Sequence, residues 1–460
     1  MGGGPVASGA DRPPRQAPIT RLVRPATYVA TAFLGLVTVG TALLLLPISR
    51  SGPGGTDAVT AFFTSASAVT VTGLTSVNTA EHWSGFGEAV ILVLIQAGGL
   101  GISTGTAIVA VVVFRRLGLR ARLYTSTESG NVALGEVGRV VRGVAILTFT
   151  VEAVLMVVFT LRWWLGYDYA FGEASWLGLF HAVSSFNNAG FTLFPDSLVG
   201  FAGDPFVLMP VSLAVILGGI GVPVLYELSR RRRDRGPLSL HSRVTLWMTG
   251  TLLIGAALVL GLTEWTNPGT LGDLSMPEKL MNAWFAGLNP RSSGFNSIDY
   301  SAMRPESWLI TDMLMFVGGG SVSTAGGIRV STLAVLLLVI KAQSRGDRDT
   351  TVAGRRFSKD LTQQALLVIV VFASLTIGGT LLLMAMSDLD TGQALFEVIS
   401  AVATCGLSTG VTSSLGAPAE VLLAMLMFIG RVGPVTLATA LALRQSDTRY
   451  RYPEGRVLLG

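Results

Sequence analysis

The sequence predicts an all-α polytopic membrane protein with eight spanning helices, arranged as four repeats of span, re-entrant pore loop and span. Three observations lead to this fold class: the composition, the placement of the basic residues and an internal repeat. The chain has 460 residues, a mean hydropathy of +0.59, 50% hydrophobic residues and only 13% charged residues. Such values are typical of a chain that lies almost entirely in a bilayer.

Basic residues collect in five blocks that alternate with segments nearly free of positive charge. These blocks hold 26 of the 33 Lys and Arg residues and cover 12–24, 115–142, 230–243, 341–359 and 444–456. The positive-inside rule places such blocks in the cytoplasm. We therefore expect a multi-pass protein of the cell (plasma) membrane with both termini cytoplasmic. Because topology accounts for the net charge of +5, no nucleic-acid partner is expected.

Apolar runs long enough to cross a bilayer occur at eight places. They cover residues 26–48, 87–114, 143–166, 205–228, 244–264, 308–340, 362–386 and 418–443. An even number of spans agrees with two termini on the same side. The first residues are rich in Gly, Pro and Arg and lack an apolar stretch, so we expect 1–23 to form a disordered cytoplasmic tail.

The connections within the four pairs of spans align without gaps on one glycine. Each glycine is followed by Leu or Phe and preceded ten residues earlier by an aromatic residue. The glycines are Gly73, Gly190, Gly294 and Gly406, and the aromatic residues are Phe63, Phe180, Trp284 and Phe396. We interpret this register as a true repeat. The expected units are the tail 1–23, pore repeats 24–118, 119–235 and 236–345, and a fourth repeat with the C-terminal tail at 346–460.

Each connection contains a stretch that suits a short helix ending just before the aligned glycine. These helices are expected to start near Asp57, Ser175, Glu278 and Asp390, since polar residues favour a helix N-terminus. Their C-terminal ends would then aim four partial negative charges at one point, which favours a cation.

The glycine allows the chain to turn outward with consecutive carbonyl groups facing the axis of a central pore, as in carbonyl selectivity filters. The candidate filter residues are Thr70, Val71, Thr72 and Gly73, then Asn187, Asn188, Ala189 and Gly190, then Arg291, Ser292, Ser293 and Gly294, and finally Ala403, Thr404, Cys405 and Gly406.

The sixth span is interrupted at its centre by the polar sequence VGGGSVSTAGGIRVST, residues 317–332. Irregular backbone at membrane depth is tolerated where it lines a water-filled cavity. The alternative, glycines that only permit close helix packing, does not require so long a stretch of small residues. We therefore expect a mobile polar loop below the filter, formed by Gly318, Gly319, Gly320, Ser321, Ser323, Thr324, Gly326 and Gly327.

Three charged residues fall within predicted spans, where charge indicates function or a specific partner. The first is Arg431, which lies in the last predicted span. Arg329 has two equal interpretations, a role in the loop or a side chain that extends to the cytoplasm. Glu152 is likewise open between a pore role and a structural contact.

The repeats, the motif GGGSVSTAGGI (318–328), the stretch MFIGRVGP (427–434) and the ending RYPEGRVLLG together resemble the TrkH/TrkG/KtrB superfamily of potassium uptake proteins. The resemblance covers the chain from about Arg24 to Gly460. It is strongest to the KtrB branch, because the first repeat begins almost at once.

This resemblance implies a membrane-embedded, K+-selective ion-translocating subunit of a potassium uptake system. It implies K+ at the filter residues, a gate made of the loop and Arg431, and a homodimer with one pore per subunit. A cytosolic nucleotide-binding (RCK-type) ring subunit and membrane lipid are the further partners. No cofactor is expected in this chain; K+ is the transported ion and Na+ a candidate stimulator.

Two other function classes make different predictions. A cation-coupled secondary transporter for Na+/K+ would predict paired broken spans in inverted repeats and buried acidic ligands. An enzyme would need a nucleophile and base or a metal set. The single cysteine, Cys405, and three scattered histidines supply neither, so the protein is not expected to be an enzyme.

Overall fold

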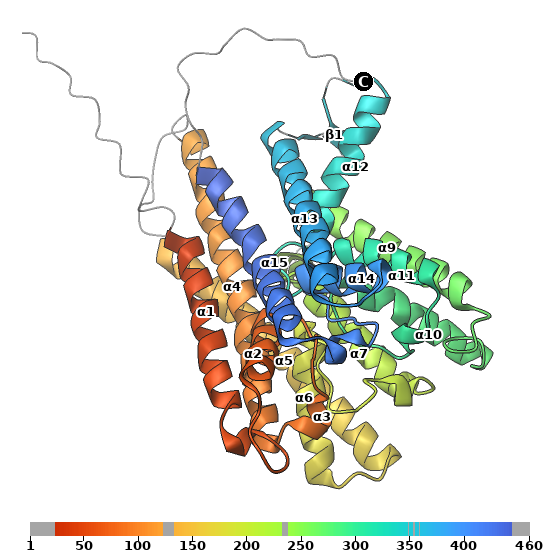
Figure 1. Cartoon of the computed structure of the whole chain (residues 1–460). Coiled ribbons are helices and arrows are strands. Elements are labelled where there is room, and N and C mark those ends of the chain that lie inside the picture. Colours follow the sequence, from red (N-terminus) through yellow and green to blue (C-terminus); the bar gives the residue numbers. More distant parts are fainter. Residues whose placement is uncertain are drawn as a thin grey trace, which may run out of the picture.

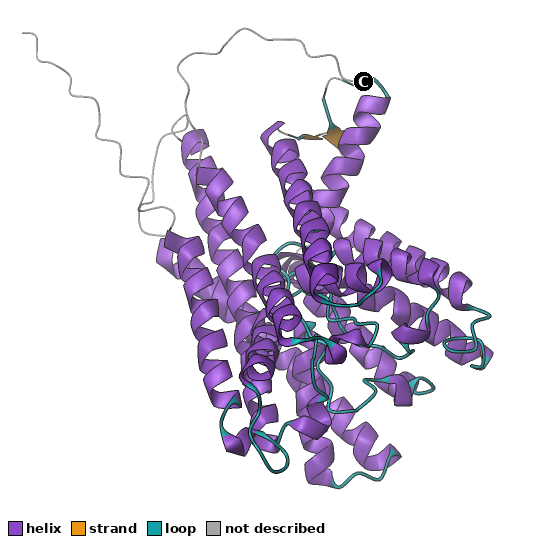
Figure 2. Cartoon of the chain, viewed as in Figure 1, coloured by secondary structure: helices purple, strands orange, loops and turns teal. Residues whose placement is uncertain are grey.

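The computed structural model describes residues 24–122, 133–231, 238–347, 349–352, 355–357 and 359–443. These residues are almost entirely helical (Figure 2). The exception is a two-residue antiparallel hairpin, β1 (Thr351–Val352) with β2 (Arg355–Arg356). The predicted all-α membrane fold is confirmed. The expected N-terminal tail at 1–23 and the end of the chain at 444–460 lie outside the described residues.

The eight expected spans correspond to long helices or helix pairs that surround a centre of loops (Figure 1). They are α1 (Arg24–Leu44), α4 (Gly85–Arg122), α5 (Ala133–Gly166), α7 (Pro205–Ile220) with α8 (Val222–Arg231), α9 (Leu240–Glu264), α11 (Pro305–Phe316) with α12 (Val330–Ser344), α13 (Lys359–Met386) and α15 (Ala417–Leu443). Within the described residues, five helices are each long and apolar enough to cross a bilayer, and the bent pair α7 and α8 gives a sixth.

The predicted span over 205–228 corresponds to two helices with a bend between them. Helix α7 ends at Ile220 and α8 leaves it at an angle of 102°. Gly221 between them has φ +104°, which residues with a Cβ rarely adopt. Pro223 follows within the first turn of α8 and cannot donate a hydrogen bond back to α7. The two residues together explain the break.

Four helices of 12 to 17 residues fill the connections: α2 (Ala58–Thr70), α6 (Phe171–Asn187), α10 (Met276–Leu288) and α14 (Thr391–Val402). They are shorter than the roughly 20 residues that a span needs. Shorter elements join them: α3 (Thr79–His82) and the 3-10 turns η2 (Pro47–Ser49), η3 (Val199–Phe201), η4 (Asn289–Arg291), η5 (Tyr300–Ala302) and η6 (Val411–Ser414).

The predicted starts of the short helices hold in two repeats and shift in two. Asp57 and Asp390 are the N-caps of α2 and α14, where their carboxylates accept backbone N–H groups. Helix α10 is capped by Ser275, and Glu278 completes the capping box from the third helical position. Helix α6 begins at Phe171, so Ser175 lies inside it and donates to the Phe171 carbonyl instead.

Close backbone packing seats the short helices against the spans. A Cβ at Gly287 of α10 would lie 2.4 Å from the backbone nitrogen of Ala257 in α9. A Cβ at Gly178 of α6 would lie 2.4 Å from the hydroxyl oxygen of Thr160 in α5. Small residues at such contacts let helix backbones approach closely in a membrane. The repeat aromatics Phe63, Phe180 and Phe396 are fully buried, which explains their column in the alignment.

Removal of the α14 cap should destabilise the protein. In Asp390→Ala the backbone N–H of Gln393 loses the carboxylate oxygen that accepts it at 2.8 Å. N-cap losses of this kind cost about 1 kcal/mol, so we expect a lower thermal unfolding midpoint in detergent. Asp388→Ala removes an exposed carboxylate two residues earlier and serves as the control. Equal midpoints for the two variants would contradict the capping role.

Candidate functional site

The C-terminal ends of α2, α6, α10 and α14 each lead into one of four glycine segments, defined as residues 70–73, 187–190, 291–294 and 403–406. All four have the same backbone pattern. The glycines have φ between +71° and +95°, and the residue two positions earlier also has positive φ: Val71 (+56°), Asn188 (+59°), Ser292 (+75°) and Thr404 (+47°). Positive φ is rare for non-glycine residues, and it is an outlier for β-branched residues such as Val71 and Thr404. Backbone strain of this kind clusters at functional sites.

The four glycines form a closed ring in chain order. A Cβ at Gly73 would lie 2.3 Å from the carbonyl oxygen of Ala189, and one at Gly190 would lie 2.7 Å from the Cα of Gly294. A Cβ at Gly294 would lie 2.9 Å from the carbonyl oxygen of Cys405, and one at Gly406 would lie 2.0 Å from that of Thr72. Each glycine therefore faces the backbone of the next segment, with no space for a side chain.

Serines six residues before the ring glycines tie the segments to their short helices. Ser67 and Ser400 accept the N–H groups of Gly73 and Gly406 with their hydroxyl oxygens at 3.1 Å. Ser184 donates its hydroxyl to the Phe191 carbonyl at 2.7 Å. These serines are not among the residues predicted from the sequence, although the gap-free alignment places all three in one column. The third repeat has Leu288 there, and Ser293 donates instead to the Asn289 side chain at 2.6 Å.

A buried carboxylate of α14 holds the chain that leaves the ring after Gly406. Glu397 accepts hydrogen bonds from the Thr409 backbone at 3.0 Å and from the Thr412 hydroxyl at 2.7 Å. The Ser408 hydroxyl adds a further bond at 2.7 Å. Glu397 is fully buried, so these donors take the place of water around it. An acid inside an apolar re-entrant helix is the signal by which the sequence could have revealed it.

The stretch between α11 and α12, residues 317–329, is not helical, as the sequence predicted, and we name it the interruption loop. It lies against the third and fourth glycine segments. Ser292 donates to the Thr404 carbonyl and accepts the N–H of Gly326, both at 2.8 Å. A Cβ at Gly326 would lie 1.9 Å from the Thr404 hydroxyl oxygen, so loop and segment are in direct contact.

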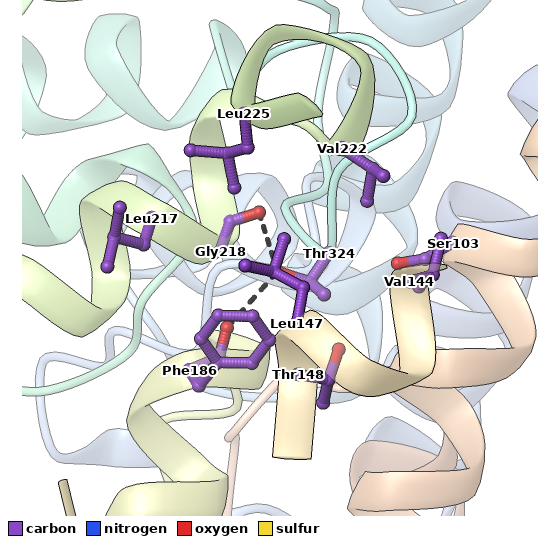
Figure 3. Close-up of a pocket in the computed structure, with 10 residues that line it drawn as sticks. All are labelled: Ser103, Val144, Leu147, Thr148, Phe186, Leu217, Gly218, Val222, Leu225 and Thr324. Atoms are coloured by element: carbon purple, nitrogen blue, oxygen red, sulfur yellow. Dashed lines mark hydrogen bonds between the residues drawn. The ribbon is translucent and has the colours of Figure 1, made fainter. Parts of the chain in front are cut away.

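The interruption loop also pairs with the break between α7 and α8. Gly320 donates its N–H to the Gly219 carbonyl at 2.8 Å, and Val222 donates to the Val322 carbonyl at 3.1 Å. Thr324 donates its hydroxyl to the carbonyls of Gly218 and Phe186, the two dashed bonds in Figure 3, where it lines a small recess with residues of α4, α5, α7 and α8. The two broken spans thus satisfy each other's backbone groups, as the membrane interior requires.

Three arginines surround this contact. Arg329 donates to the Ala325 carbonyl at 2.5 Å, to the Ser323 hydroxyl and to the Gly320 carbonyl, so its guanidinium remains within the loop and does not extend to the cytoplasm. Arg431 of α15 donates to the Thr404 hydroxyl at 3.3 Å. Arg291 donates to the carbonyls of Gly318 and Thr249 at 3.3 Å each. Arg431 therefore contacts the fourth glycine segment, against which Gly326 packs.

Comparison with known proteins gives consistent matches over nearly the whole chain. The model of the TrkH family, described as a cation transport protein, matches residues 19–452. The Ktr system potassium uptake protein B of Bacillus subtilis is 36% identical, covering 95% of this chain and 97% of its own length. The potassium/sodium uptake protein NtpJ of Enterococcus hirae is 34% identical over 96% of this chain and 98% of its own.

A solved structure has the same fold. The crystal structure of the potassium transporter TrkH from Vibrio parahaemolyticus matches with a TM-score of 0.70 and 17% identity. The match covers 93% of this chain and 86% of that one. At this identity the likeness concerns the fold alone.

The hydroxyl of Ser292 should be needed to hold the interruption loop against the fourth segment. Ser292→Ala leaves the buried N–H of Gly326 and the Thr404 carbonyl without this partner, and an unpaired buried group costs about 1 to 3 kcal/mol. We expect faster hydrogen exchange in peptides that contain Gly326. Ser321→Ala, which removes only a hydroxyl contact to Ser331, is the matched control. An equal rise in hydrogen exchange in both variants would show that the Ser292 hydroxyl does not hold the loop in place.

Proposed function

This chain belongs to the TrkH family of cation transport proteins, and on that premise we propose that it is the K+-selective ion-translocating subunit of a potassium uptake system in the cell membrane. The names of its relatives support K+ as the ion, since they are called potassium or potassium/sodium uptake proteins. The relatives are transporters, and in agreement with this the chain is not an enzyme.

The observation that carries the proposal is the ring of four glycines with its shared positive φ values. We propose that the four glycine segments form the selectivity filter and that their backbone carbonyls replace the water shell of K+. The short helices support this assignment, because four C-terminal helix ends meet at the segments and carry partial negative charge. A Cβ at any ring position would disturb the spacing of the oxygens.

The interruption loop and Arg431 are proposed as the gate. The contact of Gly326 with Thr404 supports this, because the loop then lies directly against one segment of the filter. Arg431 reaches the same threonine, which puts a positive charge next to the path of the cation. Opening would require the loop to leave Thr404 and the Gly218 and Gly219 carbonyls of α7.

A coupled secondary transporter is the second candidate. The paired breaks in α7–α8 and α11–α12 favour it, since broken spans form the sites of such proteins. Both breaks, however, lie in the second span of their repeat, so they have the same orientation rather than the inverted one. Uptake that stops when Na+ is withheld would select the coupled mechanism, whereas uptake that follows the K+ gradient would select the channel-like one.

Further proposals rest on the resemblance to Ktr systems. We propose a homodimer with one pore per subunit, both termini in the cytoplasm and regulation by a cytosolic RCK-type ring subunit. Na+ is a candidate stimulator, membrane lipid surrounds the protein, and no cofactor is proposed.

The first test is Rb+ uptake at low K+ in a bacterial strain that lacks its own potassium uptake systems, with and without a cognate ring subunit. We expect growth and saturable Rb+ uptake that K+ inhibits by competition. A difference in uptake between the two conditions would show that the ring subunit regulates this protein. Absence of uptake in both, with the protein present in the membrane, would contradict the proposal.

Substitution of a ring glycine should impair selectivity. Gly294→Ser adds a side chain where a Cβ lies 2.9 Å from the Cys405 carbonyl oxygen and where φ is +72°. We expect the preference for K+ over Na+ to fall about tenfold or more. Gly200→Ser, at an exposed glycine with no atom near its Cβ position, should transport like the parent. Unchanged apparent affinities for both ions in Gly294→Ser would exclude the filter assignment.

Shortening the interruption loop should increase flux. Deletion of residues 318–323 removes the Gly318 carbonyl that accepts from Arg291 and the Gly320 carbonyl that accepts from Arg329, so the attachment of the loop to the filter is weakened. We expect faster Rb+ uptake than in the parent, with Gly200→Ser, outside the loop, as the control. If the deleted protein folds and yet transports nothing, the loop is not a gate.

A further inference from the structure

One buried acid of the spans takes no part in the proposed filter or gate. Glu152 lies in α5 and is 5% exposed. A carboxylate at membrane depth is costly unless it is hydrogen-bonded, and it indicates function by default. Its Oε1 accepts from the Asn187 side chain at 3.0 Å, and its Oε2 accepts from the Gln96 side chain of α4 at 3.1 Å. Asn187 is the first residue of the second glycine segment.

The three side chains form a closed triangle. The Asn187 amide also donates to the Gln96 side-chain oxygen and to the Val183 carbonyl, both at 3.0 Å. Gly99 of α4 makes room for it, since a Cβ there would lie 1.9 Å from the Asn187 Oδ1. Contacts with α4 and α5 therefore fix the side chain of Asn187. Asn188, the next residue, has the positive φ that leads to the ring glycine Gly190.

In the described part of the other repeats, no carboxylate is bonded to the residue at this point. The residues that align with Asn187 are Thr70, Arg291 and Ala403. Thr70 contacts the Thr72 hydroxyl, and Arg291 donates to the carbonyls of Thr249 and Gly318. Within the described part of the chain Glu152 forms no ion pair. Both partners of its carboxylate are neutral amides, so they satisfy its oxygens without cancelling its charge.

We propose that Glu152 is a positioning and specificity-determining residue of the ion path. Through Asn187 it fixes the start of the second glycine segment, and in its ionised form its negative charge raises the affinity for a monovalent cation at the ring. The effect is strong because charges interact with little screening in a low-dielectric interior. One segment of the ring thus attracts the cation more than the others. This inference rests on the proposed function, whose filter it extends.

The test compares Rb+ uptake by the full chain and by variants that separate charge from shape. Glu152→Gln keeps the size and one acceptor oxygen but removes the charge, and we expect the apparent KM for Rb+ to rise about tenfold with a maximal rate within about twofold of the parent. Glu152→Asp restores the charge and should return most of the affinity. Glu173→Gln, at an exposed carboxylate of α6 in the same repeat, is the control. A KM in Glu152→Gln equal to that of the control would overturn the proposal.

A second measurement does not depend on transport. In Glu152→Ala the Asn187 amide loses an acceptor, so peptides covering residues 183–190 should exchange backbone hydrogens faster than in the parent or in Glu173→Ala. Unchanged exchange would refute the positioning role. If the parent itself carries no Rb+, the proposed function fails, and the exchange result still decides the role of Glu152.

Discussion

The structure depends on the close approach of four backbone segments at one ring of glycines. Each ring glycine faces backbone atoms of the next segment at distances that leave no room for a Cβ, and the last segment closes on the first. Such contact is possible only where the chain carries no side chain and can adopt positive φ. The short helices, their caps and the serines behind the ring all serve to deliver the segments to this point.

Two broken spans meet below the ring and complete each other. The bend between α7 and α8 exposes the carbonyls of Gly218 and Gly219, and the interruption loop supplies donors to both. A backbone group without a partner costs several kcal/mol in a bilayer, so neither break would be stable alone. The loop is thus held by hydrogen bonds and close glycine contacts rather than by large apolar side chains. Such a contact can separate and reform as a unit, which the proposed gate requires.

Charge is distributed unevenly around the proposed ion path. Arg329 and Arg431 lie on the side of the interruption loop, whereas Glu152 is bonded to the start of the second segment. The four repeats therefore share the same backbone geometry but differ in the charged residues that lie next to it. Fused repeats in a single chain can differ in this way, because each position mutates independently of its counterparts.

The sequence by itself determined the helical membrane fold and the repeat. Apolar runs of about 20 residues predict spans, because that length of helix crosses the hydrocarbon core of a bilayer. The alignment of Gly73, Gly190, Gly294 and Gly406 is visible in the sequence alone. A turn with the same positive φ in every repeat favours glycine at the same position of each repeat. The interruption at 317–329 was likewise evident, because small and polar residues replaced apolar ones.

Only the tertiary structure decided which residues meet. The break at Gly221 was missed because its flanks are as apolar as a continuous span, and the loop that stabilises it lies some 100 residues later in the chain. The contacts of Glu152 with Gln96 and Asn187 join three helices, and the direction of Arg329 depends on carbonyls that the folded loop presents. Hydropathy and spacing are local properties, whereas a hydrogen bond between distant segments exists only once packing has brought its donor and acceptor together.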